Sequence, residues 1–378
     1  MIKKISLSNF KLHDDTEINM GGLTVLTGMN GMGKSSIIQA LLLLRQSYFS
    51  NDLENGLNLR GDFCDLGISG ELACQSSDKH DLKIDMDFSN QAPLSYSFLY
   101  PDNIMDTLLP ASEKNVSCRE KLAGYSLFNE NFQYISAFRF GPKKSYNRDT
   151  SLVVSKKQIS KMMGQCEYTI HFLEQYKNQP IQTKELAILD ESDITPDFRL
   201  GEQVGRWLRE ISPFIKIDVK QEGEDFKLNY KFDRQDNLIT ESMSAMNTGF
   251  GITYVLPILV AVLSAKKDAL ILIENPEAHI HPKGQAVLMK LIAKAVHAGI
   301  QVVIETHSDH IVNGSLVAVN QDLINKEELS LYFFDRDEHK HVAKAHQLHV
   351  EEDGHIHPAP PMNFFDQIEI DLRTLAGF

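Results

Sequence analysis

The chain has 378 residues, 42% of them hydrophobic and 24% charged, and its formal net charge is −13. This composition is typical of a soluble globular protein with one large domain or two small ones. The acidic balance excludes a surface that attracts nucleic acid as a whole, although a local basic groove remains compatible with it.

Several features of the sequence indicate a cytoplasmic protein without a membrane partner. The longest apolar run, residues 252–265, has about 14 residues and contains Pro257, whereas a membrane span needs ~20, so we expect a core helix there. No basic-then-apolar leader opens the sequence. Four scattered cysteines form no C-x-x-C pair and are expected to be reduced thiols: Cys64, Cys74, Cys118 and Cys166.

Taken in chain order, the first predicted elements are short strands over residues 2–7, 16–18 and 23–27. A buried helix is predicted from Lys34 to about Tyr48, because apolar residues dominate its whole circumference. The N-terminal part of the chain therefore alternates strands with one long helix.

The middle of the chain changes character twice. Residues 50–140 show strand and turn patterns, whereas residues 155–212 look largely helical. Residues 213–240 favour a hairpin between Phe214–Val219 and Phe226–Phe232. We interpret this region as a large insertion within one core sheet.

Strands and helices alternate again from residue 249. Residues 270–273 and 301–304 are continuously apolar, as in strands of a sheet that is buried on both faces, and a helix over 283–298 connects them. The predicted fold is therefore α/β, with a mixed central sheet flanked by helices. We expect a single composite domain over residues 1–378, with parts at 1–48, 49–240, 241–345 and 346–378.

A phosphate-binding pattern follows the third strand. Residues 28–35, GMNGMGKS, fit G-x-x-x-x-G-K-[ST], with a strand before and a helix after, so backbone N–H groups would face the phosphates. Lys34 would contact the β- and γ-phosphates, and Ser35 would bind Mg²⁺. The predicted nucleotide-binding residues of this loop are Asn30, Gly31, Gly33, Lys34, Ser35 and Ser36.

A second motif extends this interpretation and carries a resemblance. Residues 270–274 end in the carboxylate of Glu274, where Mg²⁺ beside the phosphates would be held. With the phosphate loop, residues 5–11 (ISLSNFK), 274–282 (ENPEAHIHP) and 305–308 (ETHS) resemble ABC-type ATPase heads. The nearest groups are the SMC-like and OLD-like ATPases of bacteria, in particular an OLD-like subgroup without a nuclease domain. Further segments similar to that subgroup are residues 134–142, 353–356 and 364–367.

The resemblance implies roles for individual residues. Glu274 takes the place of the Mg²⁺-ordering aspartate, together with Ser35 as the second metal-binding residue. Asn275 stands where many such ATPases have the glutamate that activates water, and an amide can orient water but cannot accept its proton. Glu277 could supply the base, and His307 matches the histidine that approaches the γ-phosphate. The predicted cofactors are thus ATP and Mg²⁺.

A glycine-containing loop over residues 247–251 corresponds to the signature loop of the same ATPases. In such heads ATP lies between two subunits, so this loop would donate N–H groups to the γ-phosphate held by a second copy of the chain. The resemblance therefore implies an ATP-dependent homodimer in which Asn247, Gly249 and Gly251 complete the partner's site.

Three other clusters carry alternative interpretations. The pairs His279/His281 and His355/His357 could bind zinc but lack cysteines at ligand spacing. Residues 335–338 could form a nuclease metal site, but about 40 residues follow them and the next segment alternates like a return strand, which favours a hairpin. A basic cluster with interleaved aromatic residues could contact DNA or nucleotide, or form a solvated loop: Arg139, Lys143, Lys144 and Arg148.

The leading functional hypothesis is an ATPase that dimerises around ATP and acts as a switch for a separate effector protein. By analogy, the effector could be a nuclease and the setting bacterial defence or DNA transactions. One alternative is a DNA-binding repair ATPase similar to recombination mediators, so nucleic acid remains a candidate partner. Another is a nucleotide-gated scaffold with little hydrolysis, which Asn275 motivates.

Overall fold

A computed structural model of the protein describes most of the chain. The described residues are 1–113, 119–190, 195–234, 238–337, 339–361, 364–365 and 367–376. Cys118, Glu338 and Asp366, which belong to patterns discussed above, lie outside these ranges.

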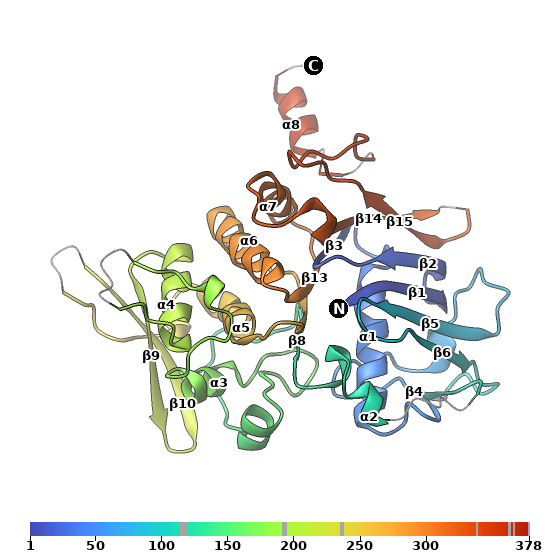
Figure 1. The fold of residues 1–378 in the computed structure, drawn as a ribbon, viewed down its shortest axis with the longest axis horizontal. Helices are drawn as coiled ribbons and strands as arrows, with labels where there is room; N and C mark the ends of the chain where they lie inside the picture. The colour runs from blue at the N-terminus through green and yellow to red at the C-terminus, as the bar shows by residue number, and fades with distance from the viewer. Residues whose placement is uncertain are drawn as a thin grey trace.

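The core of the molecule is a six-stranded mixed sheet with the order β15-β14-β3-β13-β12-β8 (Figure 1). The neighbours from β14 to β8 are parallel, and only β15 runs antiparallel to β14. The fold class predicted from the sequence is confirmed. The strands are β3 (Leu23–Gly28), β8 (Phe132–Ile135), β12 (Leu270–Glu274), β13 (Gln301–Glu305), β14 (Leu329–Asp337) and β15 (Val342–Leu348).

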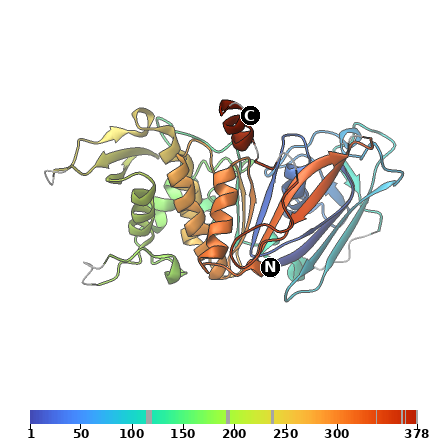
Figure 2. The same ribbon diagram turned by 90° about the horizontal axis from the view of Figure 1, so that it is seen from above.

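Five helices cover one face of this sheet. Ile271 and Ile273 of β12 and Val302 and Ile304 of β13 point into a core that these helices share. Figure 2 shows the helices on one side of the sheet and the antiparallel strands on the other. The helices are α3 (Thr169–Tyr176), α4 (Leu200–Ile211), α5 (Phe250–Ser264), α6 (Pro282–His297) and α7 (Asp309–Asn320).

The other face packs on one helix and a second sheet. Helix α1 (Lys34–Phe49) lies between the central sheet and an antiparallel sheet of order β2-β1-β5-β6. Residues 41–44 of α1 are fully buried, which explains why the helix shows no polar face. The strands of this sheet are β1 (Ile2–Phe10), β2 (His13–Asn19), β5 (Asp81–Phe88) and β6 (Leu94–Leu99).

The strand predictions in the remaining parts of the chain are confirmed. The expected hairpin is β9 (Ile215–Glu222) with β10 (Asp225–Phe232), and the segment after residue 335 turns back as β15. Short elements complete the insertion: β4 (Gly56–Asn58), β7 (Leu108–Pro110), α2 (Arg119–Leu122) and β11 (Met243–Ser244). Single turns of other helix types lie at Ser69–Glu71, Ser126–Phe128, Ser151–Ser155, Lys184–Leu186, Ala245–Asn247 and Lys326–Glu328.

The largely helical interpretation of residues 155–212 is wrong for most of that region. Among its described residues, only α3 and α4 are α-helical. Ile159, Ile181 and Leu186 are nevertheless buried, because irregular backbone packs them against the helical face of the sheet. An apolar residue every few positions therefore reflects burial here rather than a helical repeat.

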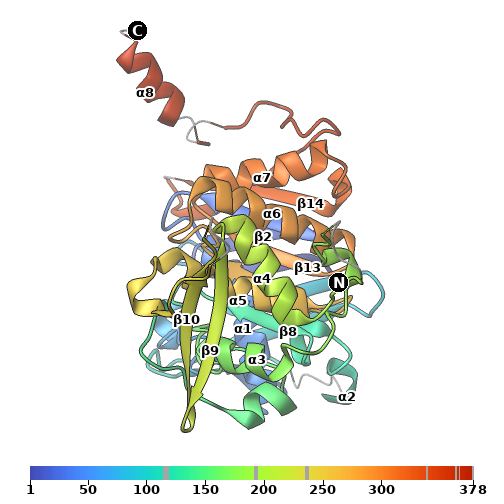
Figure 3. The same cartoon turned by 90° about the vertical axis from the view of Figure 1, so that its left-hand side faces the viewer.

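The chain ends in α8 (Gln367–Leu375), which lies apart from the body of the molecule (Figure 3). Before it, the rings of Phe364 and Phe333 meet edge to face at 5.7 Å and anchor this segment to β14. Among the helices described, none is long and apolar enough to cross a membrane. The described cysteines, Cys64, Cys74 and Cys166, are free and buried.

Candidate nucleotide-binding site

The phosphate loop leaves β3 through backbone conformations that favour glycine. Gly28 has φ of 133°, and a Cβ there would lie 2.3 Å from the carbonyl oxygen of Phe334. Gly33 has φ of 94°, and a Cβ there would lie 2.9 Å from the His13 ring. Gly31 also has positive φ, but nothing lies within 4 Å of its Cβ position. The loop is thus packed at both ends and open at the tip, where Asn30 is exposed.

Lys34 and the start of α1 close the loop on itself. The Lys34 side chain is buried, and its Nζ donates to the carbonyl oxygens of Gly28 at 2.9 Å and Met29 at 2.7 Å. Burial lowers the pKa of Lys34, and the nearby Glu305 carboxylate opposes that effect. Ser36 is buried, and its N–H donates to the Gly33 carbonyl as α1 begins. The ammonium is therefore held at the loop where phosphate oxygens are expected.

Ser35 faces Glu305, a residue to which the sequence pattern had assigned no role. The Ser35 hydroxyl donates to Oε1 of Glu305 at 2.7 Å. Glu305 ends β13 and is 6% exposed, and its Oε2 is buried without a hydrogen-bond partner among the described residues. Burial raises the pKa of Glu305 to about 7, and the negative charge of Glu274 adds to this. The strand order, which places β13 beside β3, brings this carboxylate to the loop.

Glu274 lies one strand further away and is engaged by other donors. Its Oε1 accepts from the Tyr134 hydroxyl at 2.9 Å, and its Oε2 accepts from the Ala137 N–H at 3.0 Å. Glu274 and Glu305 are register partners on β12 and β13, so their carboxylates project from the same edge of the sheet. The assignment of Glu274 as a metal ligand stays a prediction.

Arg139 fixes the turn that follows Glu274. It is 2% exposed, and its guanidinium donates to the carbonyl oxygens of Glu274, Asn275, Ser136 and Tyr254. Arg139 therefore belongs neither to a solvated loop nor to a surface that could touch DNA. The basic cluster predicted from the sequence is thus reduced to Lys143, Lys144 and Arg148.

The turn beyond Glu274 brings three further predicted residues together. Asn275 donates its N–H to the carbonyl of Glu305 and has φ of 45°. Glu277 accepts from the Thr306 hydroxyl at 2.9 Å and from the His307 N–H at 2.9 Å. Partial desolvation and the nearby Lys34 charge lower the pKa of His307, and the Glu277 carboxylate opposes that effect.

The predicted signature loop packs closely against the segment that follows this turn, at His279. Asn247 ends a single helical turn, Gly249 caps α5, and a Cβ at Gly251 would lie 2.1 Å from the carbonyl oxygen of His279. Within the described part of the chain, no hydrogen bond joins residues 247–251 to the phosphate loop.

One of the two histidine pairs considered for zinc, His279/His281, has structural contacts. The ring of His279 packs against Tyr254 at 4.6 Å and Phe250 at 6.1 Å. His281 caps α6, because its Nδ1 accepts from the Lys283 N–H at 3.2 Å. These contacts give both residues of this pair a structural role.

His13 supports the phosphate loop and was not recognised from the sequence. Its Nε2 lies 3.0 Å from the Gly33 carbonyl, so this nitrogen carries the proton, and Nδ1 then accepts from the Thr16 hydroxyl at 3.0 Å. The ring is fully buried, and burial lowers the pKa of His13 to about 4. A neutral imidazole is thus built into the base of the loop.

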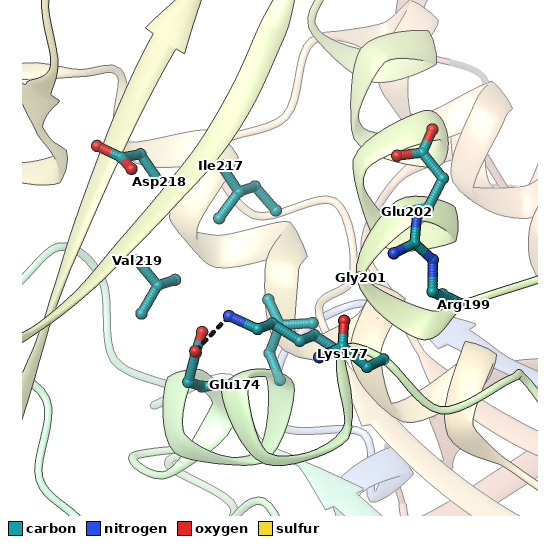
Figure 4. A pocket seen from close by; sticks show the side chains of 10 residues that line it. Glu174, Lys177, Arg199, Gly201, Glu202, Ile217, Asp218 and Val219 are labelled. Carbon is teal, nitrogen blue, oxygen red and sulfur yellow. Dashed lines mark hydrogen bonds and ion pairs between the residues drawn. The ribbon is translucent and has the colours of Figure 1, made fainter. Parts of the chain in front are cut away.

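A separate cavity of about 370 Å³ lies between α3, α4 and β9 (Figure 4). Its charged side chains already pair with neighbours: Lys177 with Glu174, Arg199 with Asp197 and Asp218 with Lys231. Its charges are therefore satisfied within the chain, and the nucleotide motifs lie elsewhere.

The fold and these motifs define an ABC-type, SMC-like P-loop ATPase. The profile of the family described as "AAA domain, putative AbiEii toxin, Type IV TA system" matches residues 23–313, and the chain belongs to that family. A family of unknown function, DUF3696, matches residues 324–375. None of the curated protein sequences matches this chain significantly.

Solved structures of SMC heads share the fold. One is an SMC head bound to the C-winged helix domain of ScpA, with 14% identity, a TM-score of 0.58, and coverage of 93% of this chain and 99% of that chain. Another is an SMC head with an extended coiled coil bound to the C-terminal domain of ScpA from Pyrococcus furiosus, with 12% identity, a TM-score of 0.52, and coverage of 100% and 99%.

The His13 contacts predict acid sensitivity. Because the folded pKa of about 4 lies below the ordinary value of 6.5, the unfolded chain binds the proton first as pH falls. This residue should therefore remove up to about 3 kcal/mol of stability between pH 6.5 and 4. Urea unfolding gives the free energy of unfolding at each pH. Its change with pH over this range should be smaller in His13→Gln than in the wild type, and should be unaltered in the control His297→Gln, whose side chain is exposed. Equal slopes in all three proteins would contradict the assignment.

The two glycines of the predicted signature loop should respond differently to alanine. Gly251→Ala places Cβ against the His279 carbonyl and should cost about 1–3 kcal/mol of unfolding free energy. Gly249→Ala meets nothing within 4 Å and should cost less than about 1 kcal/mol. Chemical denaturation measures both, and a larger loss for Gly249→Ala would show that the loop packs differently.

Proposed function

We propose that this chain binds and hydrolyses ATP with Mg²⁺, dimerises around two ATP molecules, and acts as a cytoplasmic switch for a separate effector protein. The observation that carries the proposal is the convergence of the two nucleotide motifs at one edge of the central sheet. There, the Ser35 hydroxyl donates a hydrogen bond to Glu305, which lies opposite Glu274 in the strand register. Glu277 accepts a hydrogen bond from the His307 N–H.

The residues at this edge fit a Mg²⁺–nucleotide. The loop N–H groups from Asn30 to Ser36 and the Lys34 ammonium would hold the phosphates, and the buried Glu305 oxygen without a partner among the described residues leaves an acceptor unused. The sequence alone predicts Ser35 and Glu274 as the metal-binding residues. When bound, Mg²⁺ would neutralise charge on the phosphate oxygens.

Hydrolysis needs a group that orients or activates water. Asn275 can orient water through its amide but cannot take a proton. Glu277 is a carboxylate on the same turn, and its bonds to Thr306 and His307 hold it beside the predicted γ-phosphate histidine. We assign Glu277 as the base and His307 as the phosphate contact, with Asn275 positioning the water.

Exposed apolar side chains support the dimer. Met29, Phe138, Met246 and Phe250 are between 47% and 76% exposed. They belong to the phosphate loop, the segment after β8, the helical turn at Ala245–Asn247 and the predicted signature loop. Large exposed apolar residues beside a polar site are typical of surfaces that another chain covers. Asn247, Gly249 and Gly251 would then reach the nucleotide of the second copy.

The proposed effector is a separate protein. Both SMC heads described above are bound to a ScpA domain, which supports a protein partner for this related fold. A nuclease effector and a role in bacterial defence are expectations from the resemblance. Asn275 keeps a slowly hydrolysing scaffold as the second candidate, whereas burial of Arg139 weakens the case for direct DNA binding.

Removing the loop ammonium tests the nucleotide site. Lys34→Ala should weaken ATP binding by roughly 100-fold or more, because a charged hydrogen-bond donor to phosphate is lost, and should abolish ATP-dependent dimerisation. Calorimetry and sedimentation measure the two effects. The exposed Lys83→Ala has the same charge change and should bind normally. Unchanged ATP affinity in Lys34→Ala would overturn the phosphate-loop assignment.

Replacing the proposed base tests the chemistry. Glu277→Gln should leave ATP binding intact, lower turnover by roughly 10²–10⁴-fold and accumulate the ATP-bound dimer. Single-turnover hydrolysis and sedimentation give these readouts, with the exposed Glu327→Gln as the control. Normal turnover in Glu277→Gln would leave Asn275 and His307 to position water without a carboxylate base.

A further inference from the structure

The Glu305 carboxylate is an unusual feature of the site edge. It is 6% exposed, one oxygen accepts from Ser35, and the other is buried without a partner among the described residues. Leaving a carboxylate oxygen unpaired in a buried position costs free energy. A ligand that supplies positive charge at this point would remove that cost.

The position of Glu305 follows from strand alternation. Val303 packs in the core around α1, while Val302 and Ile304 pack in the core on the helical face. Glu305, two residues after Val303, therefore points to the α1 side, where Ser35 lies in the first turn of the helix. β13 lies directly between β3 and β12, so among these three strands it separates the strand of the phosphate loop from the strand of Glu274.

Glu274, in contrast, is already satisfied. Both of its oxygens accept hydrogen bonds, from Tyr134 and Ala137, and these partners belong to β8 and the segment after it, on the side away from the phosphate loop. Glu274 would have to give up these bonds in order to bind a metal directly. Within the described part of the chain, Glu305 has an oxygen without a partner, and it already contacts the Ser35 hydroxyl.

We propose that Glu305, together with Ser35, is the carboxylate that binds Mg²⁺ at the phosphate loop, while Glu274 orders the segment after β8. This inference rests on the proposed function, since it names the metal-binding residue of that same site. A hydroxyl and a carboxylate are hard oxygen ligands of the kind Mg²⁺ prefers, and Mg²⁺ commonly takes only one or two carboxylates, with phosphates and water completing its shell.

The test separates metal binding from nucleotide binding. Affinity for a non-hydrolysable ATP analogue is measured by calorimetry, first in EDTA and then against increasing Mg²⁺, for the wild type, Glu305→Gln, Glu274→Gln and the exposed control Glu327→Gln. Bound Mn²⁺ is counted by electron paramagnetic resonance in the same proteins. Glutamine keeps the acceptor for Ser35 but removes the negative charge.

We expect Glu305→Gln to bind the analogue in EDTA within about twofold of the wild type but to need at least about tenfold more Mg²⁺ or Mn²⁺. Glu274→Gln should shift the metal requirement less than Glu305→Gln does. Glu305→Asp, which keeps the charge and shortens the side chain, should give an intermediate shift and serves if the glutamine variant does not fold.

Two results would overturn the inference. A wild-type metal requirement in the Glu305 variants, equal to that of Glu327→Gln, would leave Glu305 as a structural partner of Ser35 alone. A larger shift in Glu274→Gln than in Glu305→Gln would return the metal to Glu274. Failure of the wild type to bind the analogue at all would instead contradict the proposed function.

Discussion

The parallel pairing of β3, β13, β12 and β8 is the constraint on which the rest of the molecule depends. Parallel strands end at the same edge of a sheet, so the segments that follow them meet there although they are far apart in the chain. The phosphate loop follows β3, His307 follows β13, and Asn275 follows β12. Such a sheet must be covered on both faces, which the five helices and the α1 layer provide.

The sequence was sufficient for the features that local pattern determines. The spacing of Gly28, Gly33 and Lys34 identified the loop, and the continuous apolar runs identified the buried strands and α1 correctly. Residue spacing alone does not pair Glu277 with His307. The resemblance to ABC-type heads assigns both residues to one site, and in the structure Glu277 accepts a hydrogen bond from the His307 N–H.

The features that were missed depend on spatial neighbours. The Ser35–Glu305 contact spans 270 positions and depends on which strand lies next to β3, which no local pattern encodes. Arg139 resembles a surface cation because Lys143, Lys144 and Arg148 follow it in sequence, but backbone carbonyls surround it in space. His13 belongs to no recognisable sequence motif, because its role is to donate a hydrogen bond to the Gly33 carbonyl and to pack its ring against the same glycine.

In the turn held by Arg139, the path of the backbone and the chemistry of the side chain at residue 275 are set independently. Arg139 binds the carbonyl oxygens of Glu274 and Asn275 rather than their side chains, so the path of the backbone does not depend on which side chain stands at 275. The turn does demand positive φ at this residue, which asparagine adopts more readily than glutamate, by about 1 kcal/mol. Asparagine at this position thus lowers the strain of the turn but provides no acid–base group. One backbone angle therefore limits which residue can stand at a position where catalysis would prefer a carboxylate.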